Sequence, residues 1–470
     1  MANGDASTIT SLTLGRGSGV PDPQRRRPVL VRLVECERPC TSSSRHLLDD
    51  VDAIDVGRGD RATRRDGRRL ALSIPDPRMS SAHARLRRHG DRWQLEDLGS
   101  KNGCIVNGGL VRDARLEPGD LVELGHTFFL FHEVAVPADA APDTDATELP
   151  APRPSLATFV ASLQRGFASL ARIARTPVAV VLRGETGTGK EVVARALHEL
   201  SGRPGPFVAV NCGALPEGLL EAELFGHRKG AFSGAIADRA GYVRSADRGT
   251  LFLDEVGELP AESQMAFLRV LQDQEVVPVG DDRPVKVDMR MCAATHRDLD
   301  GLVDAGQFRR DLYARMFGLV LELPPLRERR VDLGILIAAL VARMPAGDAV
   351  RFTPSAMRAL LRHDWPLNVR ELEKCLNAAV ALAGEDAVEL DHLPPTVRRP
   401  PAARAAAAAA AMADGGAIRT GPAALREQLV ELLTVHAGNV TAVARVMGKG
   451  RMQVHRWARR FGLDLDAFRR

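Results

Sequence analysis

The chain has 470 residues, of which 64 are Lys or Arg, 60 are Asp or Glu and 45% are hydrophobic. At roughly 100–200 residues per domain, this length predicts several domains, each large enough to bury its own core. The net charge of +4 is too small to indicate a nucleic-acid-binding protein from the whole chain, so charge must be considered segment by segment. The six cysteines form no metal-binding pattern, and the longest apolar run is about half of the ~20 residues that a membrane span needs. We therefore expect a cytoplasmic protein with no membrane segment.

Residues 1–28 are polar, rich in Gly, Ser, Pro and Arg, and without hydrophobic periodicity, which predicts a disordered tail. From 29 to 135 the pattern changes to short apolar runs, such as 29–34 and 128–131, separated by turn residues. The runs recur at roughly 8–12 residues, a spacing typical of β-sandwiches. We expect an all-β domain in this region.

The loops of this β domain carry polar motifs in a fixed order. Gly57 and Arg58 come first, followed by 80–83, 99–103 and 107–108. With these motifs the region resembles the forkhead-associated (FHA) domain, and the resemblance implies a sandwich that binds a phosphothreonine protein or a kinase. Phosphothreonine carries roughly −1.5 to −2 charges and three acceptor oxygens, so cationic, hydroxyl and amide groups on loops suit it. The side chains expected to bind it are Arg58, Ser80, Ser81, Lys101 and Asn102.

His83 stands in the second of these motifs. We expect it to organise the loops through hydrogen bonds rather than to contact the ligand, as in the family. The alternative for the whole domain is a sandwich that is kept for packing and has lost its ligand.

Residues 136–154 are rich in Ala, Pro, Asp and Thr and show no periodicity, so we expect a flexible linker. Beyond it, from 155 to 397, apolar strands alternate with helical patterns and then give way to helices alone. This order predicts a parallel α/β domain followed by a helical part.

An apolar strand at 178–182 leads into a glycine-rich loop that ends in a lysine and opens a helix. Glycines allow backbone N–H groups to turn towards phosphate oxygens, and the lysine and the helix N-terminus add positive potential. The pattern predicts a phosphate-binding loop for ATP. Its residues are Gly184, Glu185, Thr186, Gly187, Thr188, Gly189, Lys190 and Glu191, the last in the place where the general motif has Ser or Thr.

A second apolar strand, 250–253, runs into the carboxylates of Asp254 and Glu255. Open α/β sheets bind ligands at the carboxyl ends of their strands, so we expect this pair beside the phosphates. Asp254 is the expected ligand of Mg²⁺ and its water shell. Glu255 is expected to orient the water that attacks ATP.

Several segments of the α/β region carry a family resemblance, namely 184–191, 223–235, 253–260, 308–315, 324–329 and 365–372. They look like the AAA+ domain of sigma-54-dependent transcriptional activators, an α/β ATPase with a helical lid, in which Glu normally follows the lysine of the loop. The resemblance implies that Asn211 restrains Glu255. It also implies that Thr295 and His296 sense the γ-phosphate and that Arg370 is a second sensor.

Arg309 and Arg315 match the arginine fingers of that family. Such arginines reach the ATP of a neighbouring subunit and stabilise the charge of the transition state. The resemblance therefore implies a ring-shaped homo-oligomer, a hexamer. Simple solvation at the surface is the alternative for both side chains.

A loop with glycines on both sides of an aromatic residue is the most discriminating segment of this region. A mobile tip that displays an aromatic side chain indicates a partner rather than a core position. In the family this loop grips sigma-54, and Ser233 here replaces the usual Thr. Two further departures are Arg228, where Glu is frequent, and Leu367, where Gly is usual and permits φ values that leucine avoids. The expected contact residues are Gly230, Ala231, Phe232, Ser233, Gly234 and Ala235.

Residues 398–422 contain an alanine run between prolines and glycines and are expected to be a linker. The segment 423–470 shows two helical patterns separated by a Gly-Lys-Gly break and resembles the all-α Fis-type helix-turn-helix domain. From 426 onward, nine basic residues stand against four acidic ones, which suits double-stranded DNA. A basic helix of a protein-interaction bundle is the alternative. The side chains expected at DNA are Arg451, Gln453, His455, Arg456 and Arg459.

The three regions together predict a regulator of sigma-54 RNA polymerase. Its FHA domain receives a phosphothreonine signal, its ATPase remodels the polymerase at the promoter, and its C-terminal domain holds DNA upstream. Two alternatives remain open at this point. One is a DNA-binding repressor or scaffold that keeps the AAA+ fold without hydrolysing ATP, and the other is an AAA+ remodeller of other proteins, such as a protease partner.

Overall fold

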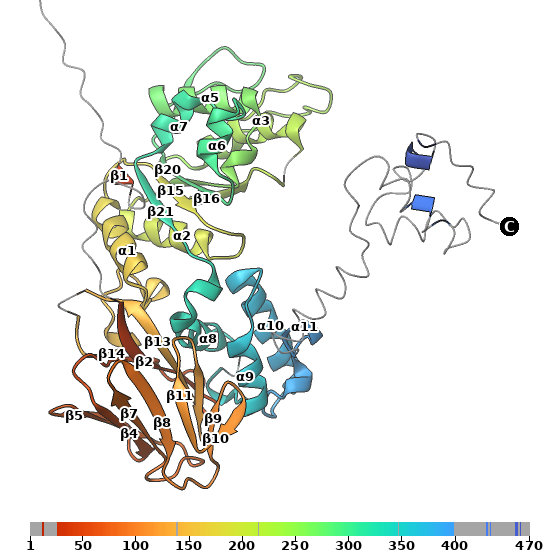
Figure 1. The fold of residues 1–470 in the computed structure, drawn as a ribbon. Coiled ribbons are helices and arrows are strands. Elements are labelled where there is room, and N and C mark those ends of the chain that lie inside the picture. Colours follow the sequence, from red (N-terminus) through yellow and green to blue (C-terminus); the bar gives the residue numbers. More distant parts are fainter. Residues whose placement is uncertain are drawn as a thin grey trace, which may run out of the picture. The chain divides into compact units, whose positions relative to one another are not determined.

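The computed structural model describes residues 12–13, 26–137, 140–214, 216–345 and 347–398, together with 429–430, 433, 456–458 and 461. They divide into two compact units, Met1–Pro394 and Pro395–Arg470, and the described sheets belong to the first (Figure 1). The expected alanine-rich linker and most of the expected tail and helix-turn-helix domain lie outside the described residues. Within the described part of the chain, no helix is long and apolar enough to cross a bilayer.

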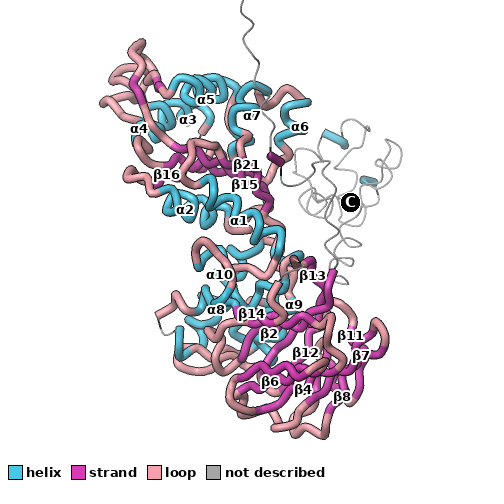
Figure 2. The backbone as a smooth tube through the Cα atoms, turned by 90° about the vertical axis from the view of Figure 1, so that its left-hand side faces the viewer, coloured by secondary structure: helices cyan, strands magenta, loops and turns pink. Residues whose placement is uncertain are grey.

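Two β-sheets form the N-terminal part of the first unit and confirm the expected all-β domain (Figure 2). One sheet has the order β10-β9-β12-β13-β2-β3-β14, and the other has the order β11-β8-β7-β4-β6-β5. The strands of the first sheet are β2 (Arg26–Glu35), β3 (Ser44–Leu47), β9 (Cys104–Val106), β10 (Gly109–Val111), β12 (Leu121–Leu124), β13 (Thr127–Ala135) and β14 (Asp143–Asp145). The strands of the second sheet are β4 (Ala53–Arg58), β5 (Ala62–Asp66), β6 (Arg69–Ile74), β7 (Ala84–His89), β8 (Arg92–Asp97) and β11 (Asp113–Leu116).

The core between these sheets follows from residue alternation along the strands. In β6, Leu70, Leu72 and Ile74 point inward and are buried, because alternate residues of a strand share one face. They meet Trp93 from β8 and Phe129 from β13 in one apolar cluster. By contrast, β2 is buried at seven consecutive residues, 29–35, which means that both of its faces are covered.

The segment expected to be a flexible linker, 136–154, has regular structure where it is described. Asp143–Asp145 forms β14, which pairs antiparallel with β3 at the edge of the first sheet. Charge pairing explains the ordering, because the Asp143 carboxylate contacts His46 Nδ1 at 2.7 Å and Arg65 Nε at 2.6 Å. Asp145 then caps a short 3₁₀ helix by accepting a hydrogen bond from Thr147 N. Composition gave no hint of these partners because they come from strands about 80–100 residues earlier.

The second part of the unit is a parallel sheet of order β1-β21-β15-β20-β17-β16 with helices on both faces (Figure 1). One apolar cluster covers each face of the sheet. The consecutive residues Phe252 and Leu253 of one strand point to opposite faces, so Leu253 belongs to one cluster and Phe252 to the other. The strands are β1 (Leu12–Thr13), β15 (Val180–Arg183), β16 (Phe207–Asn211), β17 (Thr250–Asp254), β20 (Arg290–Thr295) and β21 (Leu319–Glu322). The helices are α1 (Ala161–Ile173), α2 (Lys190–Ser201), α3 (Glu217–Phe225), α4 (Gly241–Ser245), α5 (Ala261–Asp273), α6 (Leu299–Asp304) and α7 (Arg310–Met316). A small hairpin of β18 (Glu275–Val276) and β19 (Val285–Lys286) follows α5.

Three helices, α8 (Leu333–Val341), α9 (Pro354–Arg362) and α10 (Asn368–Ala383), form the helical lid. Thr353 caps α9 by accepting a hydrogen bond from Ala356 N, and Pro354 occupies the first turn, where its missing N–H costs nothing. Helix α8 contains the longest apolar run of the chain. It lies against β2 of the β domain, which explains why β2 is covered on its second face (Figure 1).

Candidate nucleotide site and surrounding loops

The glycine-rich loop connects the end of β15 to the start of α2. Gly184, Gly187 and Gly189 have φ values of 155°, 80° and 101°, which side chains disfavour. A Cβ on Gly187 would also lie 2.2 Å from the carbonyl oxygen of Leu367 in the lid. Lys190 turns its Nζ back onto the carbonyl oxygens of Gly184 and Glu185, at 2.8 and 3.2 Å.

Asp254 and Glu255 lie at the carboxyl end of β17, beside this lysine. The Lys190 Nζ is 3.9 Å from Glu255 Oε1. Burial lowers the pKa of Lys190 and raises the pKa of Asp254, and the adjacent Glu255 raises the pKa of Asp254 further. A cation beside Asp254 would stabilise the charged form of its carboxylate. Carboxylate oxygens are the donors that Mg²⁺ prefers. The described residues hold no group of three or more His, Cys, Asp or Glu side chains that could bind a metal ion.

His296 at the end of β20 contacts the same carboxylate. Its Nδ1 lies 2.6 Å from Glu255 Oε2, and the buried Thr295 precedes it. The side chain of Asn211, expected to restrain Glu255, instead accepts a hydrogen bond from Gly213 N at 3.0 Å. In this structure His296 therefore holds the carboxylate, although Asn211 pairs in register with Asp254.

The lid closes over the loop through side chains that the sequence analysis did not single out. Arg327 donates two hydrogen bonds to the Glu185 carboxylate, at 2.9 and 2.6 Å. Asn368 donates to Glu185 Oε2 at 3.2 Å and to the Thr186 carbonyl at 3.0 Å. Arg329 donates to the Thr188 carbonyl at 2.8 Å. Both lid segments lie in motifs quoted for the family resemblance, but the motif alone could not show which residues reach the loop.

Leu367 and Arg370 stand at the start of α10, against the tip of the loop. Leu367 has a φ of −103°, so the leucine that replaces the usual glycine is not strained. The left-handed conformations in this turn belong to Trp365 and Asn368, at 53° and 58°. The Arg370 N–H donates to the Gly187 carbonyl at 3.3 Å, which brings this expected sensor next to the loop.

Arg309 and Arg315 lie at the start of α7 and along it, and both side chains are exposed. Arg309 donates two hydrogen bonds to Asp311, at 3.0 and 2.7 Å. Phe308 and Leu312 are buried in the core beneath them. The arginines thus face outward from a helix that the core fixes in place.

The loop expected to contact sigma-54 lies between α3 and α4. Phe232 is half-buried and packs edge-on against His227 with a centroid distance of 4.9 Å, so the expected display of this aromatic at the tip is not observed. The exposed apolar residue is Ile236, at 84%. Arg228 anchors the loop by contacting Asp238 and Asp281, each at 2.6 Å.

The residues expected to bind phosphothreonine come together on neighbouring loops of the β domain. A Cβ on Gly57 would lie 2.0 Å from the Ser81 carbonyl oxygen, so the glycine allows the end of β4 to approach this loop. Exposed Arg58 follows and donates its N–H to the Ser80 carbonyl at 2.9 Å. Ser80 Oγ in turn accepts a hydrogen bond from Lys101 N at 3.1 Å, and Asn102 follows on the same exposed loop.

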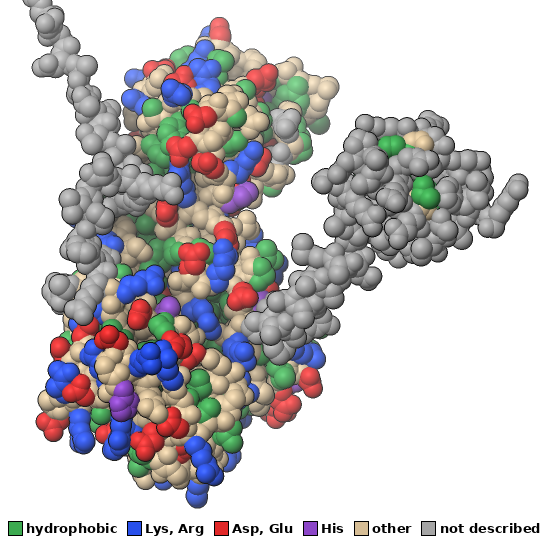
Figure 3. Space-filling view, in the orientation of Figure 1, with side chains coloured by type: hydrophobic (Ala, Val, Ile, Leu, Met, Phe, Trp, Pro, Cys, Tyr) green, Lys and Arg blue, Asp and Glu red, His purple; other side chains and the backbone are tan. Residues whose placement is uncertain are grey.

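His83 holds these loops together, as expected. It is buried, its Nδ1 accepts a hydrogen bond from Ser80 N at 3.0 Å, and its Nε2 lies 3.1 Å from the Gly103 carbonyl oxygen. The face drawn in Figure 3 shows basic and acidic side chains interspersed over the described residues, so no single-signed field covers it. Recognition of a phosphate at these loops would depend on local groups such as Arg58.

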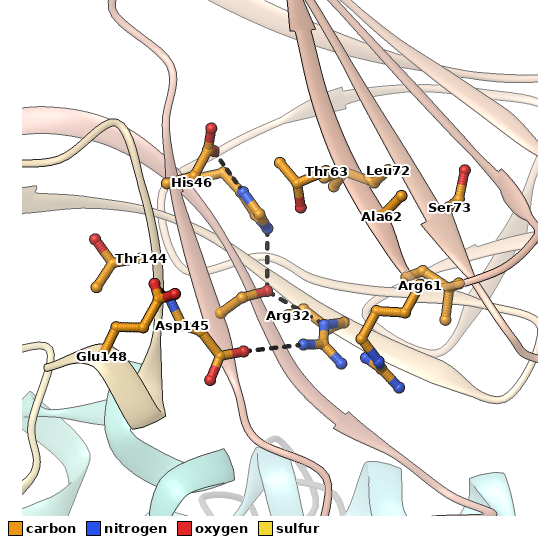
Figure 4. A pocket seen from close by; sticks show the side chains of 13 residues that line it. Arg32, His46, Arg61, Ala62, Thr63, Leu72, Ser73, Thr144, Asp145 and Glu148 are labelled. Carbon is orange, nitrogen blue, oxygen red and sulfur yellow. Dashed lines mark hydrogen bonds and ion pairs between the residues drawn. The ribbon is translucent and has the colours of Figure 1, made fainter.

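A cavity of about 310 Å³ lies elsewhere in the β domain, between β3, β5 and β14. Ser44 Oγ joins His46 Nε2 to Arg32 Nε through hydrogen bonds of 3.0 and 3.2 Å, and Arg32 forms an ion pair with Asp145 at 3.8 Å (Figure 4). Arg61 and Arg32 both contact Glu35 at 2.6 Å. The charges around the cavity are therefore paired with one another, and the cavity walls fasten β14 to the sheet.

Of the side chains expected at DNA, Arg456 is described and is exposed. The other four, Arg451, Gln453, His455 and Arg459, lie outside the described residues.

Comparison with known proteins agrees with this arrangement. Residues 157–322 match the Sigma-54 interaction domain, residues 327–410 match the AAA+ ATPase lid domain, and residues 54–125 match the FHA domain. The chain therefore contains an FHA domain, an AAA+ ATPase-type sigma-54 interaction domain and its lid.

The curated proteins that the chain resembles include regulators. The chain is 38% identical over 406 residues to the acetoin catabolism regulatory protein of Cupriavidus necator, covering 80% of this chain and 60% of that protein. It is 39% identical over 309 residues to the regulatory protein AtoC of Escherichia coli, covering 63% and 65%. The crystal structure of NtrX from Brucella abortus in complex with ATP is 30% identical over 66% of this chain and 71% of that chain, with a TM-score of 0.46. The chain spans less than two thirds of the length of either regulatory protein.

Proposed function

We propose that the chain is an ATP-dependent transcriptional activator. It binds DNA upstream of sigma-54 promoters and uses ATP hydrolysis to convert the closed complex of sigma-54 RNA polymerase to the open complex, under the control of phosphothreonine recognition by its FHA domain. The observation that carries this proposal is the grouping of Lys190, Asp254 and Glu255 at one edge of the parallel sheet of a sigma-54 interaction domain.

The residues of the chain supply the parts that phosphoryl transfer to water requires. Lys190 would exchange its carbonyl contacts for phosphate oxygens, and Asp254 would hold Mg²⁺, which neutralises charge on the phosphates when bound. Glu255, once free of His296, would orient the attacking water. Thr295 and His296 lie at the end of the adjacent strand, where they would sense the γ-phosphate.

Completion of this site requires a neighbouring subunit. Arg309 and Arg315 are exposed and lie on a helix that is fixed from below by Phe308 and Leu312. We therefore include a ring-shaped homo-oligomer, a hexamer, in the proposal, with these arginines contacting the ATP of the next subunit.

The loop from Gly230 to Ala235 would contact sigma-54. This part of the proposal is supported by the two ion pairs through which Arg228 anchors the loop. Because Phe232 packs against His227 in the structure, engagement of sigma-54 would release it. Ile236, exposed beside the loop, adds apolar surface at the same place.

The proposal is tested by open-complex formation with purified full-length protein, sigma-54 RNA polymerase and a sigma-54 promoter. A high protein concentration removes the need for a known upstream site. We expect ATP-dependent promoter melting that disappears in Lys190→Ala and persists in Lys286→Ala, a control at an exposed lysine. Absence of both hydrolysis and melting in the unmodified protein would contradict the proposal and support the repressor or scaffold instead.

A further inference from the structure

The FHA domain and the lid share a closely fitted interface within the first unit. Helix α8 approaches β2 so closely that a Cβ on Gly334 would lie 1.9 Å from the Leu33 carbonyl oxygen and 2.4 Å from Ser43 Oγ. Ser43 Oγ donates to that same carbonyl at 2.8 Å. Gly334 is the second residue of α8, and a side chain at this position would collide with β2, so close approach to β2 is the feature that requires glycine here.

An ion pair whose carboxylate is buried joins the same two parts. Glu123 of β12 is 4% exposed, and Arg358 of α9 donates to its Oε2 from Nε at 3.0 Å and from a terminal nitrogen at 2.7 Å. Burial raises the pKa of Glu123, and the hydrogen bond from Arg358 opposes that rise. Removal of the arginine would leave an acidic group buried without its charged partner.

A row of hydrogen bonds runs from this interface to the loop that carries Ser80 and Ser81. Phe352 N in the lid donates to the Cys36 carbonyl at 2.9 Å, and Cys36 N donates to the His126 carbonyl at 2.9 Å. His126 N then donates to Asp76 Oδ2 at 2.7 Å. Asp76 is 4% exposed.

Asp76 fixes the start of the loop that carries Ser80 and Ser81, here called the phosphothreonine loop, to the turn between β12 and β13. Its Oδ1 accepts from Arg78 N at 2.8 Å, and its Oδ2 also accepts from Thr127 Oγ1 at 2.9 Å. The turn is tight, because a Cβ on Gly125 would lie 2.9 Å from Met79 N. Movement of this loop is therefore coupled sterically to the turn.

On its other side the lid contacts the nucleotide loop. Arg330 donates to the Leu361 carbonyl at the end of α9, at 3.0 Å. The neighbouring Arg327 and Arg329 contact Glu185 and Thr188 of the loop. The contacts thus continue from Asp76 through the lid to Glu185 and Thr188 of the glycine-rich loop.

We propose that the FHA domain controls the nucleotide site through this docked lid, with Asp76 as a positioning residue that ties the phosphothreonine loop to the Glu123–Arg358 interface. The proposal rests on the proposed function, because it takes the loops at Ser80 and Ser81 as the place of the phosphothreonine. A phosphopeptide that shifts this loop changes the position of the lid relative to Gly187 and Glu185. Nucleotide at the AAA+ site in turn changes the affinity of the FHA domain for the peptide.

The test measures linkage in the full-length protein. A phosphothreonine peptide selected from a degenerate library is titrated with and without a slowly hydrolysed ATP analogue, and the analogue is titrated with and without the peptide. We expect each to change the Kd of the other by the same factor, about fivefold or more. The unphosphorylated peptide serves as the control for the ligand.

Three variants locate the coupling. Gly334→Ala should separate α8 from β2 without disfavouring the helix, and Arg358→Met removes the ion pair with the buried Glu123; both should bring the factor close to one. Asp76→Asn should do the same while leaving the lid docked. Matched controls are Gly218→Ala, where a Cβ meets no atom within 4 Å, Arg351→Met, an exposed lid arginine, and Asp91→Asn, an exposed acid of the FHA domain.

The outcomes separate the two proposals. A factor of one in the unmodified protein, or an unchanged factor in Gly334→Ala and Arg358→Met, would overturn the coupling while both ligands still bind. Failure of the peptide to bind would contradict the phosphothreonine function instead. If the peptide does not bind, the effect of lid docking on the nucleotide site is tested by the Kd of the ATP analogue alone. A Kd in Gly334→Ala that differs from the Kd in Gly218→Ala supports control of the nucleotide site by the lid, and equal Kd values overturn it.

Discussion

The imidazole Nδ1 of His296 lies 2.6 Å from Oε2 of Glu255. The residue expected to sense the γ-phosphate therefore contacts the carboxylate expected to orient water. The other oxygen of Glu255 lies 3.9 Å from Lys190 Nζ, so both oxygens have basic neighbours. Catalysis would require the carboxylate to exchange at least one of these contacts for water.

Replacement of Glu255 by Gln should abolish hydrolysis without abolishing binding. A group that activates water typically contributes a factor of about 10²–10⁴, so we expect kcat to fall by at least ~100-fold. The Kd of the ATP analogue should change little, because Lys190 and the glycine loop are left intact. Glu258→Gln, at a partly exposed acid paired with Arg297 at 3.2 Å, is the control. Hydrolysis at the normal rate in the Glu255 variant would show that another group orients the water.

Arg228 should position the sigma-54 loop by clamping it to the segment around Asp281. We expect Arg228→Gln to weaken sigma-54 binding, measured with an ATP transition-state analogue, and to leave basal ATP hydrolysis unchanged, because the clamp lies outside the nucleotide site. Asp281→Asn should have a smaller effect in the same direction, because Arg228 also contacts Asp238, and the double variant should be no worse than Arg228→Gln alone. Arg283→Gln, at an exposed arginine of the same segment, should bind normally. Additive losses would argue against the clamp.

The pairing of β14 should make the stability of the FHA domain sensitive to acid. Burial alone would raise the pKa of Asp143, but hydrogen bonds from His46 and Arg65 outweigh it and lower the pKa to about 2. Burial also lowers the pKa of His46, so we take the imidazole as a neutral donor and Arg65 as the charged partner. A depressed carboxylate pKa stabilises the fold above the unfolded pKa of about 4, by about 2 kcal/mol, and that stability is lost as pH falls towards 2.

Thermal unfolding at pH values from 7 to 3 tests this expectation. The unmodified protein should lose stability in the acid range, whereas Asp143→Asn should be less stable at pH 7 and change less below pH 4. Asp91→Asn, at an exposed position, should follow the unmodified protein. Parallel curves for Asp143→Asn and the unmodified protein would rule out this carboxylate as the source.

Arg58 should decide phosphopeptide affinity in the FHA domain. A charge-assisted hydrogen bond to phosphate contributes enough that its loss should raise the peptide Kd by about tenfold or more. We expect Arg58→Ala to show that loss by fluorescence anisotropy, and Arg64→Ala, an exposed arginine of the same domain, to bind normally. Equal affinities in the two variants would place the phosphate elsewhere.

Features that depend on local pattern could be predicted from the amino-acid sequence. Short apolar runs separated by turn residues indicated the β domain, the apolar strand before Gly184 indicated the nucleotide loop, and the strand before Asp254 placed the carboxylates at the sheet edge. Each of these features lies within a few residues of its signal, so composition and spacing suffice to find it.

The relationships between distant segments became visible only in the folded chain. The composition of residues 136–154 gave no indication that Asp143 would pair with His46. The motif of the glycine-rich loop did not show that Arg327 would pair with Glu185. The apolar run of α8 gave no sign of its partner until Gly334 was found against Leu33. These contacts join residues about 100 to 300 positions apart, and hydrogen bonds and close packing at such separations depend on how whole domains meet, which no local pattern contains.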